Sequence, residues 1–427
     1  MCQQHHDSQS TASKPAAAAA ASDDPFPWSE GVFDAHCHPT DTMSSLDDIP
    51  KMKAAALTVM STRSQDQSLV ADAAASTLGL PSKHKLTSDT DGARIVPCFG
   101  WHPWFSHQLF DDSGPRERWT YQLPSSDDEQ QKQAAKLAHY AAVLQPSPGP
   151  DDKAFLDSLP EPRPLSSFIS DTRARLEQHP LGLVGEVGLD KAFRLPEPFD
   201  ESSARDNSLT PGTRDGRLLS PHHVRMPHQI AILNAQLALA AELGRAVSVH
   251  GVQAHGILHD TLAATWKGHE KEVLSRRERR RIAPGAEDFS SSEDEDDPDG
   301  YRRPKRLPCG RRRVTSAPFA PRICLHSFSG ADQMMKQYLN PAIPVRIFFS
   351  FSQAINLSEK NGEEKFAALM KACPDDRILV ESDLHIAGAQ MDDALEAMYR
   401  KVCEVKGWDL EEGVRLIRRN YEEFIFG

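Results

Sequence analysis

Residues 31–38 of the chain read Gly31-Val32-Phe33-Asp34-Ala35-His36-Cys37-His38, a short apolar run that ends in two histidines. Because residues two apart in a strand point to the same side, His36 and His38 can both face one metal ion. Seven similar runs follow along the chain, and we expect all eight to form strands. They are Gly31–His36, Ala55–Ser61, Arg94–Gly100, Gly182–Val187, Arg245–His250, Arg322–His326, Val345–Ser350 and Arg377–Asp383.

The spacing of these runs indicates the fold class. They lack strict polar–apolar alternation, which is typical of strands buried on both faces. Helical patterns lie between several of them, notably over Gln229–Leu243, Ala394–Val405 and Leu410–Phe424. Strands that alternate with helices predict an α/β fold with a parallel sheet and right-handed crossovers. Eight strands favour a closed TIM-like (β/α)8 barrel over a doubly wound sheet.

The 427 residues exceed the length of a minimal barrel, and we attribute the excess to a tail and to loop insertions. Residues 1–29 are predicted to be a disordered tail, and residues 30–427 to be one barrel domain. Polar, proline-rich or charge-patterned segments interrupt the barrel at about 105–164, 191–224 and 268–320. The third is low in complexity, and we expect it to be disordered.

Composition limits the class of function. The formal net charge of −12 argues against a general nucleic-acid coat, because phosphate binding needs Lys and Arg. A local phosphodiester site remains possible where bound metal ions supply positive charge. The seven cysteines contain no C-x-x-C pair, which predicts a reduced compartment and no thiolate zinc site. With no apolar run of the ~20 residues that span a bilayer, we expect no membrane and a cytoplasmic or nuclear location.

Histidines and carboxylates recur at the carboxyl ends of the predicted strands, where barrel active sites are built. Glu186 lies at the end of the fourth strand, and Asp383 at the end of the eighth. His250 and His326 end the fifth and sixth strands. With His36 and His38 they make a nitrogen and oxygen ligand set that suits Zn, Mn or a similar ion, and a bridging Glu could hold two ions.

Each of these residues also has a structural reading. An H-x-H pair is common by chance, and a lone histidine after a strand is more often a hydrogen-bonded core residue. Glu186 could form a loop salt bridge, and Asp383 could be a helix N-cap. The six together, in barrel order, argue against coincidence.

Six ordered motifs carry a resemblance to a known family. The chain resembles the TatD family of metal-dependent deoxyribonucleases within the amidohydrolase superfamily. Within it, the stretch Gly188-Leu189-Asp190-Lys191-Ala192-Phe193-Arg194-Leu195-Pro196 resembles the fungal branch described as Cut9-interacting. The six motifs are Phe33-Asp34-Ala35-His36-Cys37-His38, Gly100-Trp101-His102-Pro103, Gly185-Glu186-Val187-Gly188-Leu189-Asp190, Val247-Ser248-Val249-His250, His326-Ser327-Phe328-Ser329-Gly330 and Leu379-Val380-Glu381-Ser382-Asp383.

The resemblance implies a role for each residue. His36 and His38 would bind a first divalent ion, His250 and His326 a second, and Glu186 would bridge the two. The ions would be Mg, Mn or Zn. Asp383 would bind metal and take the proton from the attacking water, so that Asp383 and Glu186 are the implied catalytic residues. The implied activity is cleavage of phosphodiester bonds in DNA, often from an exposed 3′ end. The implied protein partner is a Cut9-type subunit of the anaphase-promoting complex, bound through the insertions.

The chain departs from the family's usual pattern at three places that border the substrate. Lys191 stands where many members carry an aromatic residue. Gly251 and Val252 follow His250, where an Arg is usual. Leu384-His385-Ile386 replaces the usual proline after Asp383.

His102 lies beside a proline and between two tryptophans, and we predict that it binds substrate through a phosphate contact. Its alternative reading is a turn histidine held by Pro103. Trp101 and Trp104 could stack on a base or pack the loop onto the barrel.

The third insertion contains basic clusters within Arg276–Arg281, Arg302–Arg306 and Arg311–Arg313, and Ser290 before an acidic run. The clusters indicate nuclear import, a nucleic-acid contact or a charge-balanced solvated loop. The serine before the acidic run suits phosphorylation by an acid-directed kinase. The alternative is an unmodified loop.

Three hypotheses of function follow. The first is a metal-dependent DNase. The second is another amidohydrolase-type enzyme acting on an ester or amide of a small molecule, since fold does not fix substrate. The third is an interaction protein with reduced catalysis whose insertions bind a partner.

Overall fold

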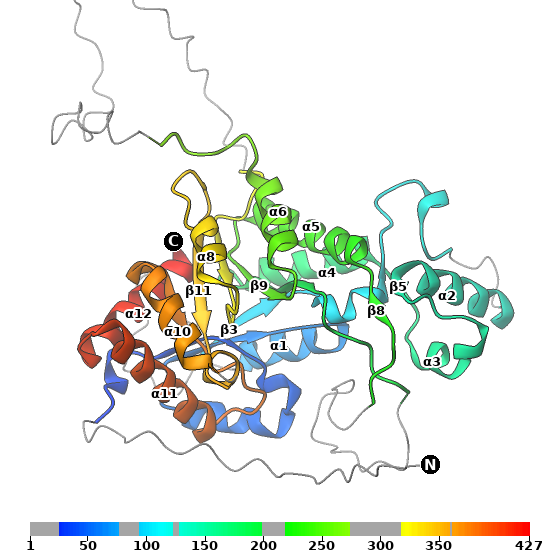
Figure 1. The fold of residues 1–427 in the computed structure, drawn as a ribbon. Coiled ribbons are helices and arrows are strands. Elements are labelled where there is room, and N and C mark those ends of the chain that lie inside the picture. Colours follow the sequence, from blue (N-terminus) through cyan, green and yellow to red (C-terminus); the bar gives the residue numbers. More distant parts are fainter. Residues whose placement is uncertain (1–24, 77–93, 123–127, 199–217, 274–316, 359–360) are drawn as a thin grey trace, which may run out of the picture.

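The computed structural model describes residues 25–76, 94–122, 128–198, 218–273, 317–358 and 361–427. Each of the eight predicted strands is present, displaced by at most a few residues at its ends. One parallel sheet contains them all (Figure 1). Their bounds are β1 Phe33–Cys37, β2 Ala56–Met60, β3 Arg94–Phe99, β7 Leu183–Asp190, β9 Val247–Val252, β10 Arg322–Leu325, β11 Arg346–Phe351 and β12 Ile378–Val380.

The sheet closes nearly into a barrel. Its strands follow one another in chain order, β1-β2-β3-β7-β9-β10-β11-β12. The two outer strands meet through backbone hydrogen bonds just beyond β12, where Asp383 N–H donates to His36 O at 3.0 Å and His38 N–H donates to Leu384 O at 2.8 Å. This order and this closure exclude the doubly wound alternative and confirm the TIM-like barrel.

Helices surround the sheet. The three predicted from periodicity are α5, α11 and α12, and α5 ends at Gly244 with φ 63°, the left-handed geometry that glycine adopts without strain. The helices are α1 Ser64–Ser76, α2 Glu129–Val143, α3 Lys153–Ser158, α4 Leu165–Gln178, α5 Met226–Leu243, α6 His255–Trp266, α8 Asp332–Tyr338, α9 Gln353–Asn356, α10 Gly362–Ala372, α11 Ala389–Lys406 and α12 Leu410–Phe426. Short 3-10 helices are η1 Trp28–Glu30, η2 Pro39–Asp41, η3 Met43–Lys51, η4 Pro103–Gln108, η5 Arg116–Arg118, η6 Pro150–Asp152 and η8 Asp375–Arg377.

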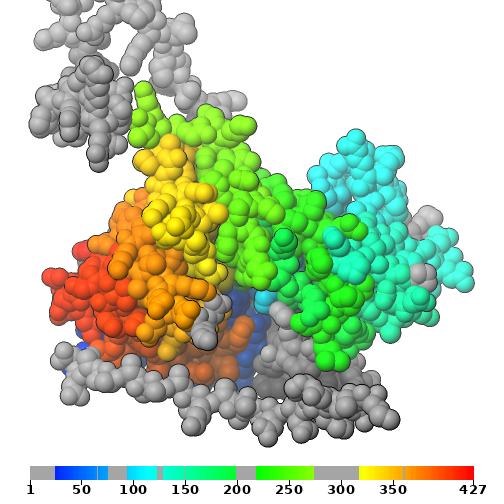
Figure 2. All heavy atoms as spheres, in the orientation of Figure 1, coloured from blue at the N-terminus to red at the C-terminus, as the bar shows by residue number. Residues whose placement is uncertain are grey.

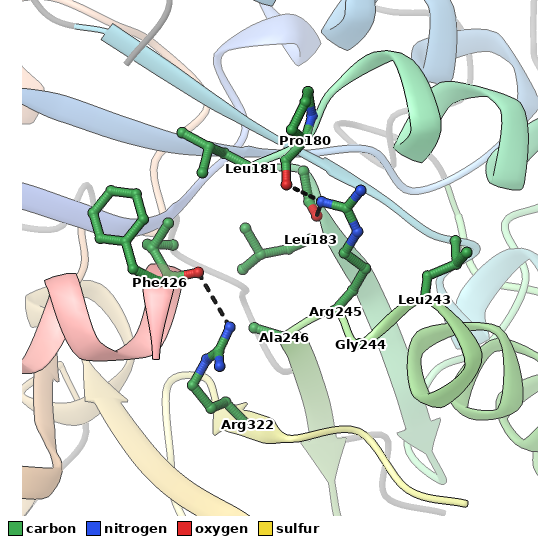
Figure 3. Close-up of a pocket in the computed structure, with 11 residues that line it drawn as sticks. Pro180, Leu181, Leu183, Leu243, Gly244, Arg245, Ala246, Arg322 and Phe426 are labelled. Carbon is green, nitrogen blue, oxygen red and sulfur yellow. Dashed lines mark hydrogen bonds between the residues drawn. The ribbon is translucent and has the colours of Figure 1, made fainter. Parts of the chain in front are cut away.

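The amino ends of the strands form the base of the barrel, and α12 packs there. Phe33 stacks on Tyr421 of this helix, with ring centroids 4.7 Å apart. A small cavity of about 210 Å³ lies beside it, between Arg245 and Arg322 (Figure 3). Both guanidinium groups donate to backbone carbonyls, so the base is a structural region.

Helices α2 and α3 form a lobe at one side of the barrel, within the predicted insertion at 105–164 (Figures 1 and 2). The lobe has its own small core, in which Tyr140 and Phe155 are buried beside Phe193. Two-stranded pairs join the lobe to the chain around it. They are β4 Leu109–Phe110 with β6 Arg163–Pro164, and β5 Leu144–Gln145 with β8 His223–Val224.

Parts of the predicted tail and insertions lie outside the described residues. These parts are residues 1–24, 123–127, 199–217 and 274–316, and the last includes the basic clusters and Ser290. Within the described end of the tail, Phe26 packs against Tyr399 with ring centroids 6.1 Å apart. No helix among the described residues is long and apolar enough to cross a membrane.

Candidate metal centre

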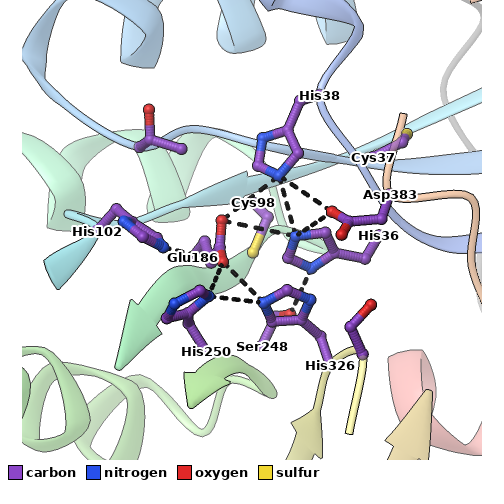
Figure 4. Close-up of polar contacts among 12 residues, drawn as sticks. His36, Cys37, His38, Cys98, His102, Glu186, Ser248, His250, His326 and Asp383 are labelled. Atoms are coloured by element: carbon purple, nitrogen blue, oxygen red, sulfur yellow. Dashed lines mark hydrogen bonds and ion pairs between the residues drawn. The ribbon is translucent and has the colours of Figure 1, made fainter. Parts of the chain in front are cut away.

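The structure brings all the predicted site residues together at the carboxyl ends of the strands (Figure 4). Glu186, in β7, lies at the centre. Its Oε1 atom is 2.8 Å from His326 Nε2, 2.9 Å from His250 Nδ1 and 3.1 Å from His102 Nε2. One carboxylate oxygen therefore faces three imidazoles.

The other oxygen of Glu186 faces the histidines of β1. Its Oε2 atom is 3.4 Å from His38 Nε2 and 3.6 Å from His36 Nε2. Asp383 Oδ1 approaches the same two nitrogens, at 3.7 Å and 3.9 Å. Glu186 thus lies between two groups of nitrogen donors, one on each side.

Close backbone approach places Glu186 there. A Cβ atom on Gly188 would overlap the carbonyl oxygen of His250, and one on Gly100 would lie 2.5 Å from the carbonyl carbon of Gly185. Both are too close for any side chain. Gly100, after β3, and Gly188, in β7, therefore let β7 lie directly against β3 and β9, which brings the Glu186 carboxylate and His250 together.

Polar neighbours orient the imidazoles through their second nitrogens. Ser248 Oγ is 3.0 Å from His36 Nδ1, and Asp190 Oδ2 is 3.2 Å from His250 Nε2. Asp190 is itself held, because Trp104 Nε1 donates to its Oδ2 atom at 2.6 Å. Partners of this kind fix the ring orientation and tautomer of metal-binding histidines.

The backbone is strained where two of these strands end. Asp383 has φ 55° and Ser327 has φ 40°, values that residues other than glycine seldom adopt. Ser327 N–H and Oγ donate to Glu381 at 2.8 Å and 2.5 Å, and the Asp383 amide bonds to His36. Strain held in place by surrounding contacts is typical of functional sites.

Burial and charge set the protonation states of these groups. Burial lowers the pKa of His38 to about 3 and that of His102 to about 4, so both rings are neutral near pH 7. Burial alone would raise the pKa of Glu186, but the imidazoles of His102, His326 and His36 hold it well below its usual range. Burial raises the pKa of Asp383. Despite burial, hydrogen bonds to Asp190 and Glu186 raise the pKa of His250, and the charge of Glu186 raises the pKa of His326 well above its usual value. A bound cation would replace the protons on these two rings, since imidazole binds metal in its neutral form.

The donor set fits divalent metal ions. Three overlapping groups have ligand atoms close enough to share an ion: His36, Glu186 and His326; His36, His38 and Asp383; and His102, Glu186 and His250. The Nε2 atoms of His36 and His38 lie 3.1 Å apart, and a cation between neutral rings would accept both lone pairs. Imidazole and carboxylate donors suit Zn, Mn and similar ions.

His102 lies in a turn, as the alternative reading of its sequence expected, and it also faces the metal centre. It is the N-cap of η4, and its Nδ1 atom accepts from Trp104 N–H at 3.2 Å. Its Nε2 atom therefore faces Glu186 and is a further candidate ligand. The predicted phosphate contact stays a prediction. Of the two tryptophans, Trp101 is buried against Phe168, whereas Trp104 stacks on Phe193 at 4.7 Å.

Several supporting residues were missed at the sequence level. Asp34 accepts hydrogen bonds from Ser382 N–H at 3.0 Å and Ser382 Oγ at 2.5 Å, which ties β1 to the end of β12. Gln229 exchanges hydrogen bonds with the backbone of Asp190, each at 2.8 Å. One feature of the sequence could have indicated that Asp34 supports the site. Asp34 stands two residues before His36, and residues two apart in a strand point to the same side.

A cavity of about 950 Å³ opens above these groups. His38, Glu186, His250, His326 and Asp383 form part of its lining. A barrel with buried histidines and carboxylates at the carboxyl ends of its parallel strands is the arrangement of metal-dependent hydrolases.

The chain belongs to the TatD-related DNase family, whose model matches residues 33–426. It is therefore a TatD-family hydrolase in fold, and the family is metal-dependent. It is 35% identical to the Cut9-interacting protein scn1 of Schizosaccharomyces pombe over 397 residues, which cover 93% of this chain and 99% of that protein.

Two further relatives come from Saccharomyces cerevisiae. An uncharacterized deoxyribonuclease is 26% identical over 293 residues, which cover 68% of this chain and 67% of that protein. The crystal structure of an uncharacterized amidohydrolase aligns over 94% of this chain and 100% of its own, with a TM-score of 0.49 and 13% identity.

Proposed function

We propose that this protein hydrolyses phosphodiester bonds of DNA with two bound divalent ions. One observation carries the proposal: the two oxygens of Glu186 face separate groups of histidines, beside Asp383 and beneath a large cavity. In this proposal His36 and His38 would hold one ion and His250 and His326 the other, and Glu186, which faces both pairs, would contribute to both. Similarity to a named deoxyribonuclease supports the choice of substrate.

The residues of the chain orient the reactants and move the proton. When bound, divalent ions neutralise phosphate oxygens and lower the pKa of water. Asp383 reaches into the cavity beside His38 and accepts the proton of the attacking water. Asp190 and Ser248 keep His250 and His36 in the orientation that presents their free nitrogens to the site. Glu186 stays ionised throughout, because the surrounding imidazoles stabilise its charge.

A metal analysis and a nuclease assay test this function. Bound metal is measured in the purified protein, and end-labelled DNA is incubated with Mg²⁺, Mn²⁺ or Zn²⁺. We expect cleavage that His36→Ala and Asp383→Ala abolish. Bound metal without DNA cleavage would instead support an amidohydrolase-type enzyme that acts on a small-molecule ester or amide. Absence of both would support a barrel with reduced catalysis.

A protein partner is a second candidate function. The relative named as Cut9-interacting matches this chain over almost its whole length, which supports a partner of the Cut9 kind, a subunit of the anaphase-promoting complex. The lobe of α2 and α3 is the described part of the insertions that could contact it. Binding of the purified Cut9-type subunit to the full chain, compared with a chain that lacks residues 128–158, tests this proposal.

A further inference from the structure

The imidazole of His102 has a polar contact at each of its two nitrogens. His102 is the N-cap residue of η4, and Trp104 N–H donates to its Nδ1 atom at 3.2 Å. Its Nε2 atom lies 3.1 Å from Oε1 of Glu186 (Figure 4). The residue is buried, with 2% of its surface exposed. By distance alone, His102 could be either a metal ligand or a hydrogen-bond donor to Glu186.

The hydrogen bond at Nδ1 decides between these two roles. A backbone N–H can only donate, so Nδ1 of His102 is the acceptor and carries no hydrogen. A neutral imidazole has one ring hydrogen, which must then lie on Nε2 and point at the Glu186 carboxylate. A metal ion binds a ring nitrogen through its lone pair. In this tautomer of His102, Nε2 has no lone pair to offer.

Two other histidines of the centre have the opposite surroundings at their second nitrogens. His250 Nε2 lies 3.2 Å from Oδ2 of Asp190, and His326 Nδ1 lies 3.6 Å from Oε1 of Glu381. A carboxylate favours a hydrogen on the nitrogen that it faces, so the other nitrogen of each ring can present its lone pair to an ion. His102 therefore differs from these ligands in its tautomer, although all three rings approach the same carboxylate oxygen.

The backbone on both sides of His102 keeps the ring in this orientation. His102 N–H donates to Thr62 O at 2.8 Å, and Phe105 N–H donates to His102 O at 3.0 Å. A ligand at Nε2 would need the ring hydrogen on Nδ1. That hydrogen and the Trp104 N–H would then be two donors facing each other, and their present hydrogen bond would be lost. The local fold of η4 thus favours the tautomer that donates to Glu186.

We propose that His102 is a positioning residue, whose Nε2–H donates to Oε1 of Glu186, and that it is not a metal ligand. This inference rests on the proposed two-ion centre and deepens it. The ion on that side of the carboxylate then has three protein donors, from His250, His326 and Glu186. A zinc site with three protein ligands keeps a position for water or substrate, whereas a further imidazole would close it.

Nitrogen NMR of the full-length protein tests the tautomer directly. The histidines are isotope-labelled, and spectra are recorded of the metal-free protein and of the protein loaded with Zn²⁺. The signals of His102 are those that disappear in His102→Gln. We expect a neutral ring with its hydrogen on Nε2 in both samples, whereas a nitrogen of His250 should shift when Zn²⁺ binds. A Zn²⁺-induced shift of His102 Nε2 with loss of its hydrogen would overturn the inference.

Two substitutions separate the donor from the helix cap. His102→Asn keeps an oxygen for the Trp104 amide, since asparagine is a favoured N-cap residue, but removes the donor to Glu186. His102→Gln keeps an N–H donor on a longer side chain. In competition with a chelator, we expect Zn²⁺ affinity to fall about 10–100-fold in His102→Asn and clearly less in His102→Gln. An equal loss in both would indicate a lost ligand. An unchanged affinity in His102→Asn with a raised KM for DNA would indicate a phosphate contact, and either result would overturn the inference.

His107→Asn is the matched control. His107 is another buried histidine of η4, with 4% of its surface exposed, and it does not line the cavity. Its substitution should leave Zn²⁺ affinity unchanged, and an equal loss there would show that any disturbance of η4 weakens binding, which would contradict the role of His102. Zn²⁺ binding without DNA cleavage would contradict the proposed function alone. A protein that binds no Zn²⁺ would contradict both.

Discussion

At the base of the barrel, Arg245 and Arg322 direct their guanidinium groups at the last carbonyls of two helices. At the mouth of the barrel, where the carboxyl ends of the strands lie, the imidazoles of the metal centre face one another instead. Arg245 donates to Leu176 O, at the end of α4, at 2.7 Å. Arg322 donates to Phe424 O, at the end of α12, at 2.8 Å. At the mouth, the Nε2 atoms of His36 and His38 lie 3.1 Å apart.

The difference separates stability from function within one fold. Terminal helix carbonyls lack partners inside the helix, and the arginines at the base satisfy them. These hydrogen bonds at the base need no bound ligand. At the mouth, imidazole nitrogens and carboxylates lie close together, and a bound cation would stabilise them. The free energy of this region therefore depends on what binds there. Substitutions should therefore change folding at one end and chemistry at the other.

The largest expected effect is that of Asp383→Asn at the mouth. Asparagine tolerates the left-handed backbone found at φ 55°, so the change removes the proton acceptor with little strain. We expect kcat on a DNA substrate to fall roughly 10²–10⁴-fold, the usual contribution of a general base. Steady-state kinetics and thermal melting measure the two consequences separately.

Asp375→Asn is the matched control at the base. Asp375 accepts a hydrogen bond from Lys406 Nζ at 2.8 Å and lies far from the cavity lining. We expect its kcat to equal that of wild type. The separation of stability at the base from catalysis at the mouth would be contradicted by either of two results. One is a similar loss of activity in both variants, and the other is a melting temperature that falls in Asp383→Asn alone.

The next effect is on metal affinity, through Asp190→Asn. Asp190 holds His250 Nε2 at 3.2 Å, and its replacement loosens the ring that presents Nδ1 to Glu186. Loss of such a partner typically weakens metal binding about 10–100-fold. Competition with a chelator measures it. Asp392→Asn removes another buried carboxylate, which accepts from Lys53 and Ala54 N–H, and an equal loss of affinity there would contradict the role of Asp190.

The fold could be predicted from the sequence where an element is defined by its own residues, and it could not be predicted where packing against distant residues defines it. All eight strands were found because each is a compact apolar run between polar segments. Helix α2 was not found, because Glu129–Val143 begins with five polar residues and its apolar residues are mostly alanines, which give little apolar periodicity. Its burial depends on Tyr140 and Val143 packing with residues much farther along the chain, such as Phe193.

The site residues could be predicted where a metal-binding residue type stands at the end of a predicted strand. The six proposed ligands were identified because each lies at the carboxyl end of a predicted strand, where a barrel builds its site. The role of Asp34 was missed, because it depends on a partner that the sequence does not place beside it. Asp34, for example, bonds to Ser382, 348 residues away. A buried polar residue of this kind resembles any hydrogen-bonded core residue until the fold is known.

Arg245→Met should reverse the pattern of the mouth variants. The substitution leaves carbonyls at the end of α4 without their donor, and we expect the free energy of unfolding to fall by about 2 kcal/mol. Activity per folded molecule should not change. Urea denaturation and kinetics below the transition measure both. Arg173→Met removes an exposed pair with Glu242 and should cost under about 1 kcal/mol, so a larger loss there than at Arg245 would refute the structural role of the base.

Acid gives the smallest effect, because it acts on a buried histidine of the lobe, His139 in α2, and leaves the arginines at the base charged. Burial lowers the pKa of His139 to about 4, well below its value in an unfolded chain. The ring is neutral in the fold, with Nε2 donating to His107 O at 2.8 Å and Nδ1 facing Thr120 Oγ1 at 2.9 Å. The unfolded chain binds the proton first as pH falls.

The sign of the pH dependence follows from that difference. The contribution of His139 to stability is complete above its unfolded pKa near 6.5 and is lost as pH falls toward 4. Linkage gives a loss of roughly 1 kcal/mol between pH 7 and pH 6. His139→Gln should therefore flatten the dependence of the unfolding free energy on pH by this amount, measured in urea at each pH. If the variant and the wild type show the same slope, then His139 is solvated in the native state and the lobe is less tightly packed on the barrel than the structure indicates.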